Sequence, residues 1–212
     1  MLDQRLATRV EDFVSRLKRE SVCMHGFILD VRGEVKATAY YPPFEEGEAH
    51  RMYSVSKSMT ALAIGLLLDE GKISLDDRIA DYFRDFLPEK PDARLMRLKI
   101  RDMLRMATCY RATVYRETDD DWTKPFFTAE PTHEPGTVFH YDTGCSQVLA
   151  ALVARLTGQQ VMDYLTERVF TPLGADDEKH WLRDPAGTCQ GGTGLCMSLR
   201  DLHKVTRLVM DG

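Results

Sequence analysis

The apolar positions of the chain predict helices over most of its length, beginning with residues 2–20. Apolar residues recur there at intervals of three and four among charged ones, which predicts an amphipathic surface helix. Residues 51–71 differ, because a short polar segment runs into a stretch of mostly apolar residues that ends at Gly71. A helix that is apolar all round is usually buried, and a glycine just past its end is a common C-cap. We therefore expect one long core helix here.

Residues 25–41 carry the pattern of a β-hairpin. Two short β-prone runs, His25–Val31 and Glu34–Tyr41, flank Arg32-Gly33, and Pro42-Pro43 ends them. Two strands alone make a marginal sheet, because independent stability normally requires more strands or a packed helix. A hairpin without sheet neighbours leaves an open edge that is prone to pair with another chain. A homo-oligomer formed through this edge is therefore one expectation.

The remaining patterns predict further helices, two of which begin with a capping box. Ser74 and Ser198 are each followed three residues later by an aspartate, an arrangement that satisfies backbone donors at a helix start. Residues 109–138, in contrast, are rich in acids, aromatics and proline with little periodicity, which indicates a long surface excursion of the kind that often carries function. In total we expect one hairpin and about seven helices. The later predicted helices are one after Ser74 that carries Ile79, Tyr82, Phe83 and Phe86, and those at residues 100–106, 146–156, 160–169 and 198–212.

Composition narrows the class of partner. The 212 residues are 43% hydrophobic, enough to bury a core as one domain, and their formal net charge is −5. A negative net charge disfavours nucleic acid or an anionic membrane as a partner unless one face is locally basic. The one basic cluster alternates with apolar residues at helical spacing, so we interpret it as a solvated helix face and expect no nucleic-acid binding. Its members are Arg94, Arg97, Lys99, Arg101 and Arg105.

Membrane, leader and metal signals are weak. No apolar run reaches the roughly 18 residues that a membrane helix needs, and the N-terminus lacks the basic start and apolar centre of a signal peptide. A cytoplasmic protein is expected, or an extracytoplasmic one if the N-terminus was trimmed. The five cysteines are odd in number and have no C-x-x-C spacing, and the glycine-rich turn at Gly191 lacks the lysine-serine ending of a phosphate loop. We expect reduced thiols, no metal and no cofactor.

The chemistry that the sequence offers centres on Ser54 and Lys57, three positions apart at the start of the long apolar helix. Side chains at this spacing lie on the same helix face, so the hydroxyl and the amine would touch. Burial lowers a lysine pKa towards the range in which the amine can act as a base, which makes the pair a candidate nucleophile and proton acceptor. The alternative is an N-cap serine followed by a solvated lysine.

Ser-x-x-Lys by itself is a weak signal, because the chain also contains it at Ser15 and Lys18. Ser15 lies in the middle of the first predicted helix among basic residues, with no helix N-terminus nearby. The N–H of Ser54 belongs instead to the first turn of a buried helix, whose dipole favours a developing oxyanion. The position of Ser54 therefore favours catalysis.

Several motifs in a fixed order give a family resemblance. They are Tyr-Ser-Val-Ser-Lys-Ser-Met-Thr from Tyr53, Leu-Lys-Ile-Arg-Asp-Met-Leu from Leu98, Pro-Gly-Thr-Val-Phe-His-Tyr from Pro135, Pro-Leu-Gly from Pro172, and Gly-Gly-Thr-Gly-Leu from Gly191. From about His25 onward the chain resembles the penicillin-recognising serine hydrolases, which include serine β-lactamases, D-Ala-D-Ala peptidases and related esterases. The resemblance implies a mixed α/β fold of the β-lactamase/transpeptidase type. Residues 1–45 would supply a helix and hairpin of its antiparallel sheet, and residues 46–212 the helical lobe of the same domain.

The resemblance also implies roles for single residues. Ser54 corresponds to the acylated nucleophile, Lys57 to its partner, and Tyr141 to the tyrosine of the Tyr-x-Asn motif in the branch similar to class C β-lactamases. A phenol is a poor base alone, but a neighbouring ammonium lowers its pKa. Without the other motifs, Tyr141 would be interpreted as an ordinary half-buried tyrosine. Thr143 stands where the motif has asparagine and lacks an amide's paired donor and acceptor, and we expect Thr143 and His140 to contact substrate.

The third family motif has no clear counterpart. In the family it is Lys-Thr-Gly or His-x-Gly on a strand that provides the second oxyanion-hole N–H. Gly192-Thr193-Gly194 is similar in composition, but we predict that a capping box and helix follow it instead of a strand. The C-terminal strands of the fold are thus expected to be missing from the chain. We expect a serine hydrolase acting on a small ester or amide; the alternative is a catalytically silent relative or fragment that acts through binding.

Overall fold

The computed structural model describes residues 4–212, and these form two structural units. The first unit contains the residues up to His50 together with Val169–Lys179 and Met197–Gly212. The second unit contains Arg51–Arg168 and His180–Cys196. Both units are therefore built from segments that are far apart in the sequence.

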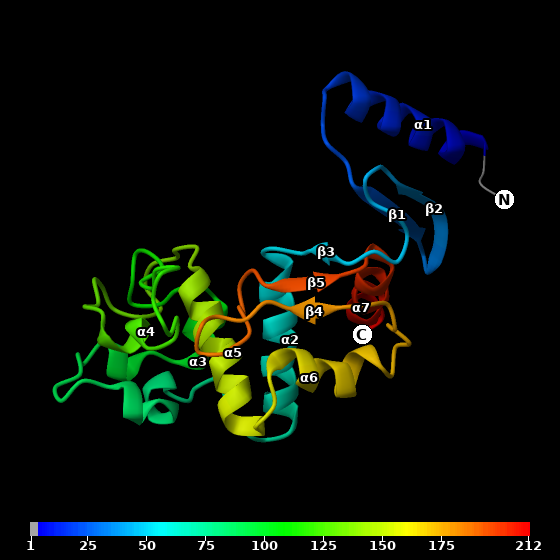
Figure 1. The fold of residues 1–212 in the computed structure, drawn as a ribbon. Helices are drawn as coiled ribbons and strands as arrows, with labels where there is room; N and C mark the ends of the chain where they lie inside the picture. The colour runs from blue at the N-terminus through cyan, green and yellow to red at the C-terminus, as the bar shows by residue number, and fades with distance from the viewer. Residues whose placement is uncertain (1–3) are drawn as a thin grey trace. The chain divides into compact units, whose positions relative to one another are not determined.

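The first unit holds the predicted hairpin and two helices (Figure 1). Strands β1 (Gly26–Val31) and β2 (Glu34–Tyr40) pair antiparallel from Gly26↔Tyr40 to Val31↔Glu34, with an irregularity after Leu29. The turn residues Arg32 and Gly33 both have positive φ, 55° and 86°, as a tight two-residue hairpin turn requires. The predicted hairpin is confirmed. The two helices are α1 (Gln4–Arg19) and α7 (Leu199–Asp211).

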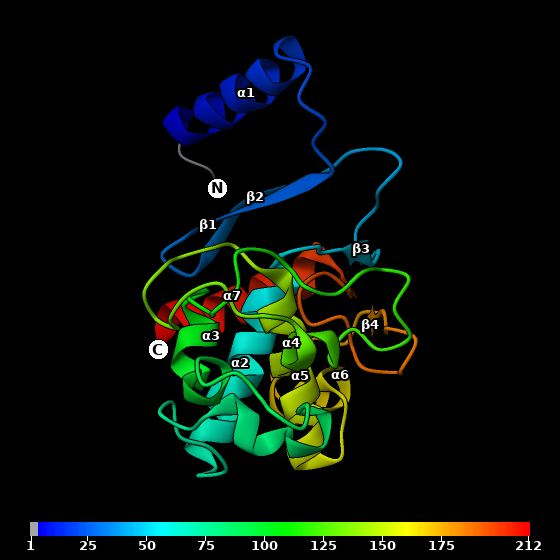
Figure 2. The same cartoon turned by 90° about the vertical axis from the view of Figure 1, so that its left-hand side faces the viewer.

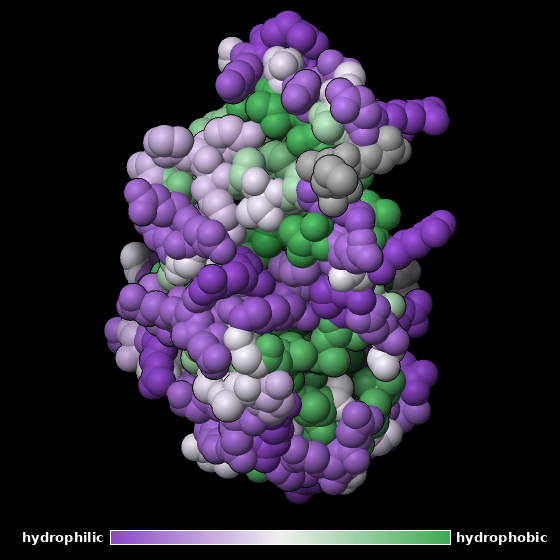
Figure 3. All heavy atoms as spheres, turned by 90° about the vertical axis from the view of Figure 1, so that its right-hand side faces the viewer, coloured by the Kyte–Doolittle hydropathy of each residue, from purple (hydrophilic) through white to green (hydrophobic). Residues whose placement is uncertain are grey.

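Both helices of the first unit contact the hairpin through side chains. Phe13 of α1 meets Phe27 of β1 edge to face, with 5.6 Å between ring centroids. On the other helix, the His203 ring lies 2.9 Å from the Asp30 carboxylate. The groove between α1 and β1 has a volume of about 360 Å³ and is lined by apolar residues together with Arg9. Figure 3 shows that hydrophobic residues reach the surface of the molecule in several places among the hydrophilic ones. The apolar side of α1 thus faces the hairpin.

The second unit is mainly helical, with α5 at its centre (Figures 1 and 2). Every residue of α5 from Gly144 to Val153 is buried. The apolar helix α2 runs beside α5, and α3, α4 and α6 also pack on α5. The helices are α2 (Val55–Asp69), η1 (Ile79–Tyr82), η2 (Arg84–Phe86), η3 (Leu95–Arg97), α3 (Ile100–Leu104), α4 (Pro125–Thr128), α5 (Thr143–Thr157), α6 (Val161–Leu165) and the π-helical η4 (Thr166–Phe170).

A second sheet was not predicted. Its strands are β3 (His50–Arg51), β4 (His180–Trp181) and β5 (Leu195–Met197), in the order β3-β5-β4. Strands of two or three residues are too short to show an alternating pattern. The expectation that a helix follows Gly194 directly is therefore wrong, because β5 comes between the glycine-rich turn and α7.

The predicted helix after Ser74 is also wrong. The capping interactions do form, since Asp77 Oδ2 accepts the Ser74 N–H at 2.7 Å. Beyond them, however, the backbone pairs with a distant segment: Ile79 N–H donates to Leu98 O and Ile100 N–H donates to Asp77 O, both at 3.0 Å. These long-range bonds replace helical ones, and the segment forms the short 3₁₀ turns η1 and η2.

Residues 109–138 are not simply a surface excursion. Tyr110, Trp122, Phe126 and Phe127 are buried, and the Tyr110 hydroxyl donates to Phe126 O at 2.6 Å. These buried aromatic residues occur at irregular intervals along the segment. Burial of a segment is inferred from a regular spacing of apolar residues, so the sequence did not reveal it here.

The basic cluster is matched by acids. Arg94 pairs with Asp92, Arg97 with Glu134, and both Lys99 and Arg101 with Asp76. The interpretation as a solvated face fits these pairs, because neighbouring carboxylates offset most of the local positive charge. All five cysteines are free. No helix within residues 4–212 has the length and apolarity to cross a membrane.

Capping residues end or begin the helices where the sequence predicts. Gly71 and Gly158 follow α2 and α5 with φ of 67° and 71°. At the start of α7, Ser198 Oγ accepts the Asp201 N–H at 3.0 Å and its hydroxyl donates to Asp177 at 2.6 Å. Ser198 is fully buried, so both of its hydrogen bonds are shielded from water.

Replacing Ser198 with alanine is expected to lower the free energy of unfolding by about 1–2 kcal/mol, because a helix cap and a buried hydrogen bond are lost together. Urea unfolding followed by circular dichroism measures this. The matched control is Ser15→Ala in the exposed middle of α1, which should change stability by less than about 0.5 kcal/mol. Equal midpoints for the two variants would contradict the capping role.

Candidate active site

Ser54 lies at the junction between β3 and α2. It is the N-cap residue of α2, has helical φ and ψ, and its side chain makes no capping hydrogen bond. The preceding residue, Tyr53, has φ of 44°, a region that residues other than glycine rarely adopt. No hydrogen bond joins the Ser54 N–H to another residue in the described part of the chain. The Ser54 N–H thus lies unpaired within the described residues at the N-terminus of α2, where the helix dipole favours negative charge.

Lys57 is held between two oxygen atoms. Its Nζ lies 3.2 Å from Ser54 Oγ and 2.8 Å from the backbone carbonyl oxygen of Gly192. The helical spacing predicted the first contact, whereas the second comes from a residue 135 positions away. Lys57 is half-buried, so its ammonium depends on these acceptors more than a solvated lysine would.

Tyr141 completes the cluster. Its ring centroid lies 4.9 Å from Lys57 Nζ. A hydrogen bond with Ser54 lowers the pKa of the Tyr141 phenol, and a hydrogen bond with Lys57 and its positive charge act in the same direction against a smaller effect of burial. The structure therefore brings Ser54, Lys57 and Tyr141 together.

The close approach of the 190–194 turn to two helices depends on glycine. A Cβ atom at Gly191 would overlap the Ser146 carbonyl oxygen of α5, and one at Gly192 would overlap the Thr143 methyl group. On the α2 side, the Thr60 hydroxyl donates to Gly191 O at 2.8 Å. The two glycines let the turn lie against α2 and α5, which carries the Gly192 carbonyl to Lys57.

Thr143 and His140 have different surroundings. Thr143 is the first residue of α5; its N–H donates to Thr113 Oγ1 at 3.1 Å, and its side chain lines a pocket. Asp142 is buried beside it and accepts the Thr113 hydroxyl at 2.7 Å. His140 is half-buried and donates its backbone N–H to Met106 O at 2.9 Å, and no hydrogen bond or ion pair of its side chain within residues 4–212 is seen. Substrate contact by His140 stays a prediction.

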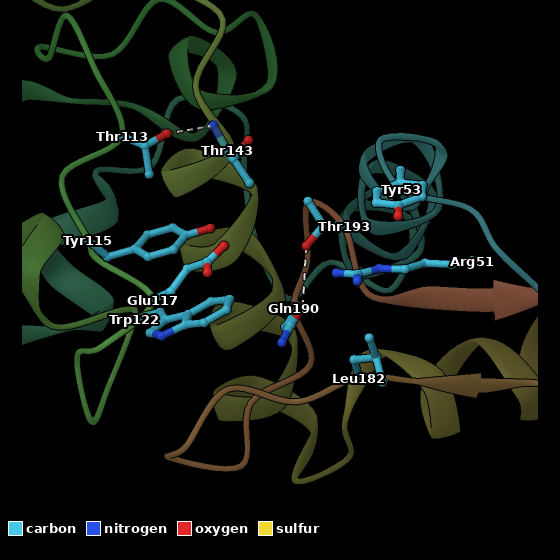
Figure 4. A pocket seen from close by; sticks show the side chains of 10 residues that line it. All are labelled: Arg51, Tyr53, Thr113, Tyr115, Glu117, Trp122, Thr143, Leu182, Gln190 and Thr193. Carbon is cyan, nitrogen blue, oxygen red and sulfur yellow. Dashed lines mark hydrogen bonds between the residues drawn. The ribbon is translucent and has the colours of Figure 1, made fainter.

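A pocket of about 730 Å³ lies beside the cluster (Figure 4). Tyr115 and Trp122 stack on one wall, with centroids 4.8 Å apart and planes at 11°. Glu117 belongs to the same wall, and Arg51 projects from the opposite side. Neither charge forms an ion pair within the described residues, although the Arg51 guanidinium lies 4.8 Å from the centroid of the Tyr53 ring.

Sequence reasoning missed this pocket wall. The prediction that residues 109–138 carry function was the one signal, because aromatic residues are frequent there. It did not select particular residues, since the pairing of Tyr115 with Trp122 depends on how the segment folds back. Within residues 4–212 no group of three or more histidines, cysteines, aspartates or glutamates is placed to hold a metal ion.

Comparison with known proteins now decides the family. The family model described as Beta-lactamase matches residues 26–212. The chain belongs to the Beta-lactamase family. This confirms the resemblance that the ordered motifs gave. The family model begins at β1, so α1 lies outside the matched region.

Individual relatives show how much of a Beta-lactamase family protein the chain represents. It is 28% identical over 224 aligned positions to the 6-aminohexanoate-dimer hydrolase of Paenarthrobacter ureafaciens, covering 98% of this chain and 56% of the relative. Penicillin-binding protein 4 of Amycolatopsis lactamdurans is 34% identical over 57% of this chain and 33% of its own length. The chain thus spans about half, or less, of the length of these curated relatives.

Solved structures show the same fold. A class C β-lactamase mutant matches with a TM-score of 0.76 at 15% identity, over 93% of this chain and 63% of its own. The octameric penicillin-binding protein homologue from Pyrococcus abyssi matches with a TM-score of 0.74 at 18% identity, over 97% and 56%. The expected β-lactamase/transpeptidase-like mixed α/β fold is confirmed, and the chain covers part of it.

The position of Tyr141 predicts an unusual titration. Burial raises the pKa of Tyr82, Tyr115 and Tyr164 to about 12, whereas the pKa of Tyr141 is lowered. As pH rises, Tyr141 should form its phenolate before these three tyrosines, and ultraviolet difference spectroscopy detects each phenolate. Tyr141→Phe should remove the earliest step, and Ser54→Ala should move it to higher pH.

Tyr53→Phe is the matched control for this titration, because Tyr53 is also largely exposed but the cation over its ring is Arg51 instead of Lys57. It should retain the early step. An unchanged titration curve after Tyr141→Phe would show that the phenol of Tyr141 is not activated.

Proposed function

We propose that this Beta-lactamase family protein is a serine hydrolase that forms an acyl-enzyme on Ser54 and hydrolyses an ester or amide. The observation that carries the proposal is the cluster of Ser54 Oγ, Lys57 Nζ and Tyr141 at the head of α2. A nucleophile within hydrogen-bond reach of a proton acceptor, which a third group orients, is the usual arrangement for covalent catalysis. Membership of the family supports it.

The chemistry would proceed in two halves. Ser54 Oγ attacks the substrate carbonyl carbon while its proton passes to Lys57 or Tyr141, and the oxyanion receives the Ser54 N–H. The tetrahedral intermediate then collapses, the leaving group departs with that proton, and water hydrolyses the ester on Ser54. Which of the two groups serves as general base is left open, because both contact the hydroxyl.

The pocket suggests a class of substrate. The Arg51 cation and the Glu117 anion face it from opposite sides without ion-pair partners among the described residues, and stacked Tyr115 and Trp122 offer an apolar wall on the Glu117 side. Such a site fits a short chain with an amine near one end and a carboxylate near the other. A relative named for the 6-aminohexanoate dimer, whose linear form has this character, supports the assignment.

The alternative is a catalytically silent relative that acts through binding. Thr143 in place of the motif's asparagine favours it, because a hydroxyl cannot replace both halves of an amide. The second oxyanion donor of the family's third motif has no counterpart among the contacts seen at Ser54, and losing one donor costs roughly a hundred- to a thousandfold in rate. Activity is therefore proposed for the whole protein that carries this chain.

Labelling of the whole protein with a fluorophosphonate or a penicillin, followed by peptide mass mapping, tests the enzyme proposal. An adduct should form on Ser54 and disappear in Ser54→Ala. Ser15→Ala, which removes the other Ser-x-x-Lys serine, should leave labelling unchanged. A folded protein without an adduct on Ser54 would favour the binding alternative.

Substrate charge provides a separate test. Glu117→Gln should raise KM about tenfold for a linear amide that bears a free amine, because a hydrogen-bonded ion pair is lost, and should hardly affect the same amide with the amine acetylated. Arg51→Gln should do the same for the free carboxylate. Glu130→Gln, an exposed glutamate elsewhere in the 109–138 segment, is the control. Equal effects on charged and capped substrates would contradict the proposed orientation.

A further inference from the structure

The Gly192 carbonyl contacts Lys57 more closely than Ser54 does. Lys57 Nζ lies 2.8 Å from Gly192 O and 3.2 Å from Ser54 Oγ. A backbone carbonyl is always an acceptor, so it holds the ammonium in place whatever the protonation of its neighbours. The position of Lys57 therefore depends on the contacts that hold the backbone around Gly192 in place.

The backbone just before Gly192 is fixed from two helices. The Thr60 hydroxyl of α2 donates to Gly191 O at 2.8 Å. The Gly191 N–H donates to the side-chain oxygen of Gln147, on α5, at 3.1 Å. Gly191 cannot shift toward α5, because its backbone already lies against the Ser146 carbonyl.

Gln147 is an unexpected residue at its place in α5. It is 1% exposed, in the middle of a helix segment that is buried throughout. Burying an amide is unfavourable unless all its groups are hydrogen-bonded. The amide oxygen of Gln147 is satisfied because it accepts the Gly191 N–H. The amide nitrogen of Gln147 needs an acceptor elsewhere.

Asp184 is that acceptor. Gln147 Nε2 donates to Asp184 Oδ2 at 3.1 Å, and Asp184 is 4% exposed. The carboxylate also accepts the Trp122 N–H at 3.2 Å and the Thr188 N–H at 2.8 Å. Because an ionised carboxylate can only accept, it turns the amide nitrogen of Gln147 toward itself and leaves the oxygen for Gly191.

We propose that Gln147 is a positioning residue for Lys57, acting through the Gly191-Gly192 peptide, and that Asp184 fixes the orientation of its amide. The inference rests on the proposed function, in which Lys57 takes part in acylation. In this inference, the buried amide of Gln147 and the buried carboxylate of Asp184 together set the distance between the Lys57 amine and the Ser54 hydroxyl. Neither group forms a hydrogen bond with Ser54.

Gln147→Met tests this, because methionine has a similar length and volume but no strong acceptor. The whole protein is treated with a fluorophosphonate, and the rate constant of Ser54 labelling is measured separately from the final labelled fraction. We expect the rate constant to fall about tenfold, as for loss of one hydrogen-bonded support of a charged group, while the labelled fraction stays complete. A merely structural role would lower the fraction instead.

A second readout does not depend on Ser54 reactivity. Competitive acetylation with peptide mapping gives the reactivity of the Lys57 amine itself. In Gln147→Met the acetylation rate of Lys57 should rise, because the amine is no longer held at a fixed distance from the Gly192 carbonyl oxygen. Gln159→Met, just beyond the C-terminal end of α5, where the amide contacts Glu167, should leave both readouts unchanged.

Gln147→Glu guards against misfolding of the methionine variant. Protonated glutamic acid reproduces both hydrogen bonds of the amide, whereas ionised glutamate repels Asp184. Labelling should therefore recover as pH falls, relative to the native protein at each pH. A wild-type acetylation rate of Lys57 in both variants would overturn the inference. Absence of Ser54 labelling in the native protein would instead contradict the proposed function, and the acetylation rate of Lys57 would still decide the role of Gln147.

Discussion

The close contact of the Gly191-Gly192 peptide with α2 and α5 is the constraint on which the candidate site depends. Any side chain at either position would overlap a backbone or methyl group of α5. Because the contact is possible, one backbone carbonyl reaches the amine of Lys57 at 2.8 Å. The helix pair alone would place Lys57 beside Ser54, but the turn gives the ammonium a second, permanent acceptor.

The elements that the sequence predicted correctly are those fixed by local physics. The hairpin follows from Arg32-Gly33, whose positive φ values few residues other than glycine, asparagine and aspartate adopt. The ends of α2 and α5 follow from Gly71 and Gly158, and the start of α7 from Ser198. Each signal acts within four residues of itself, so no knowledge of the rest of the fold is needed.

The errors share the opposite cause. After Ser74 the capping hydrogen bonds form as predicted, yet pairing of Ile79 with Leu98 replaces the helix that they would start. Strand β5 is three residues long and exists because its neighbours β3 and β4 pair with it.

The candidate site divides in the same way. Ser54 and Lys57 were found from helical spacing, and Tyr141 from a motif. The Gly192 carbonyl, Gln147 and the wall of Tyr115 and Trp122 come from contacts between distant segments, for which no local pattern exists.

Thr143 connects the family pattern with the particular packing of this chain. Its methyl group fills the space next to Gly192 that a Cβ atom there would need, and its backbone N–H is bound by Thr113. The residue that departs from the Tyr-x-Asn motif is therefore held by the same turn that supplies the carbonyl to Lys57. A longer amide at this position would have to extend away from Gly192, toward the pocket that Thr143 lines. The shorter side chain of Thr143 therefore fills less of that pocket than an asparagine would.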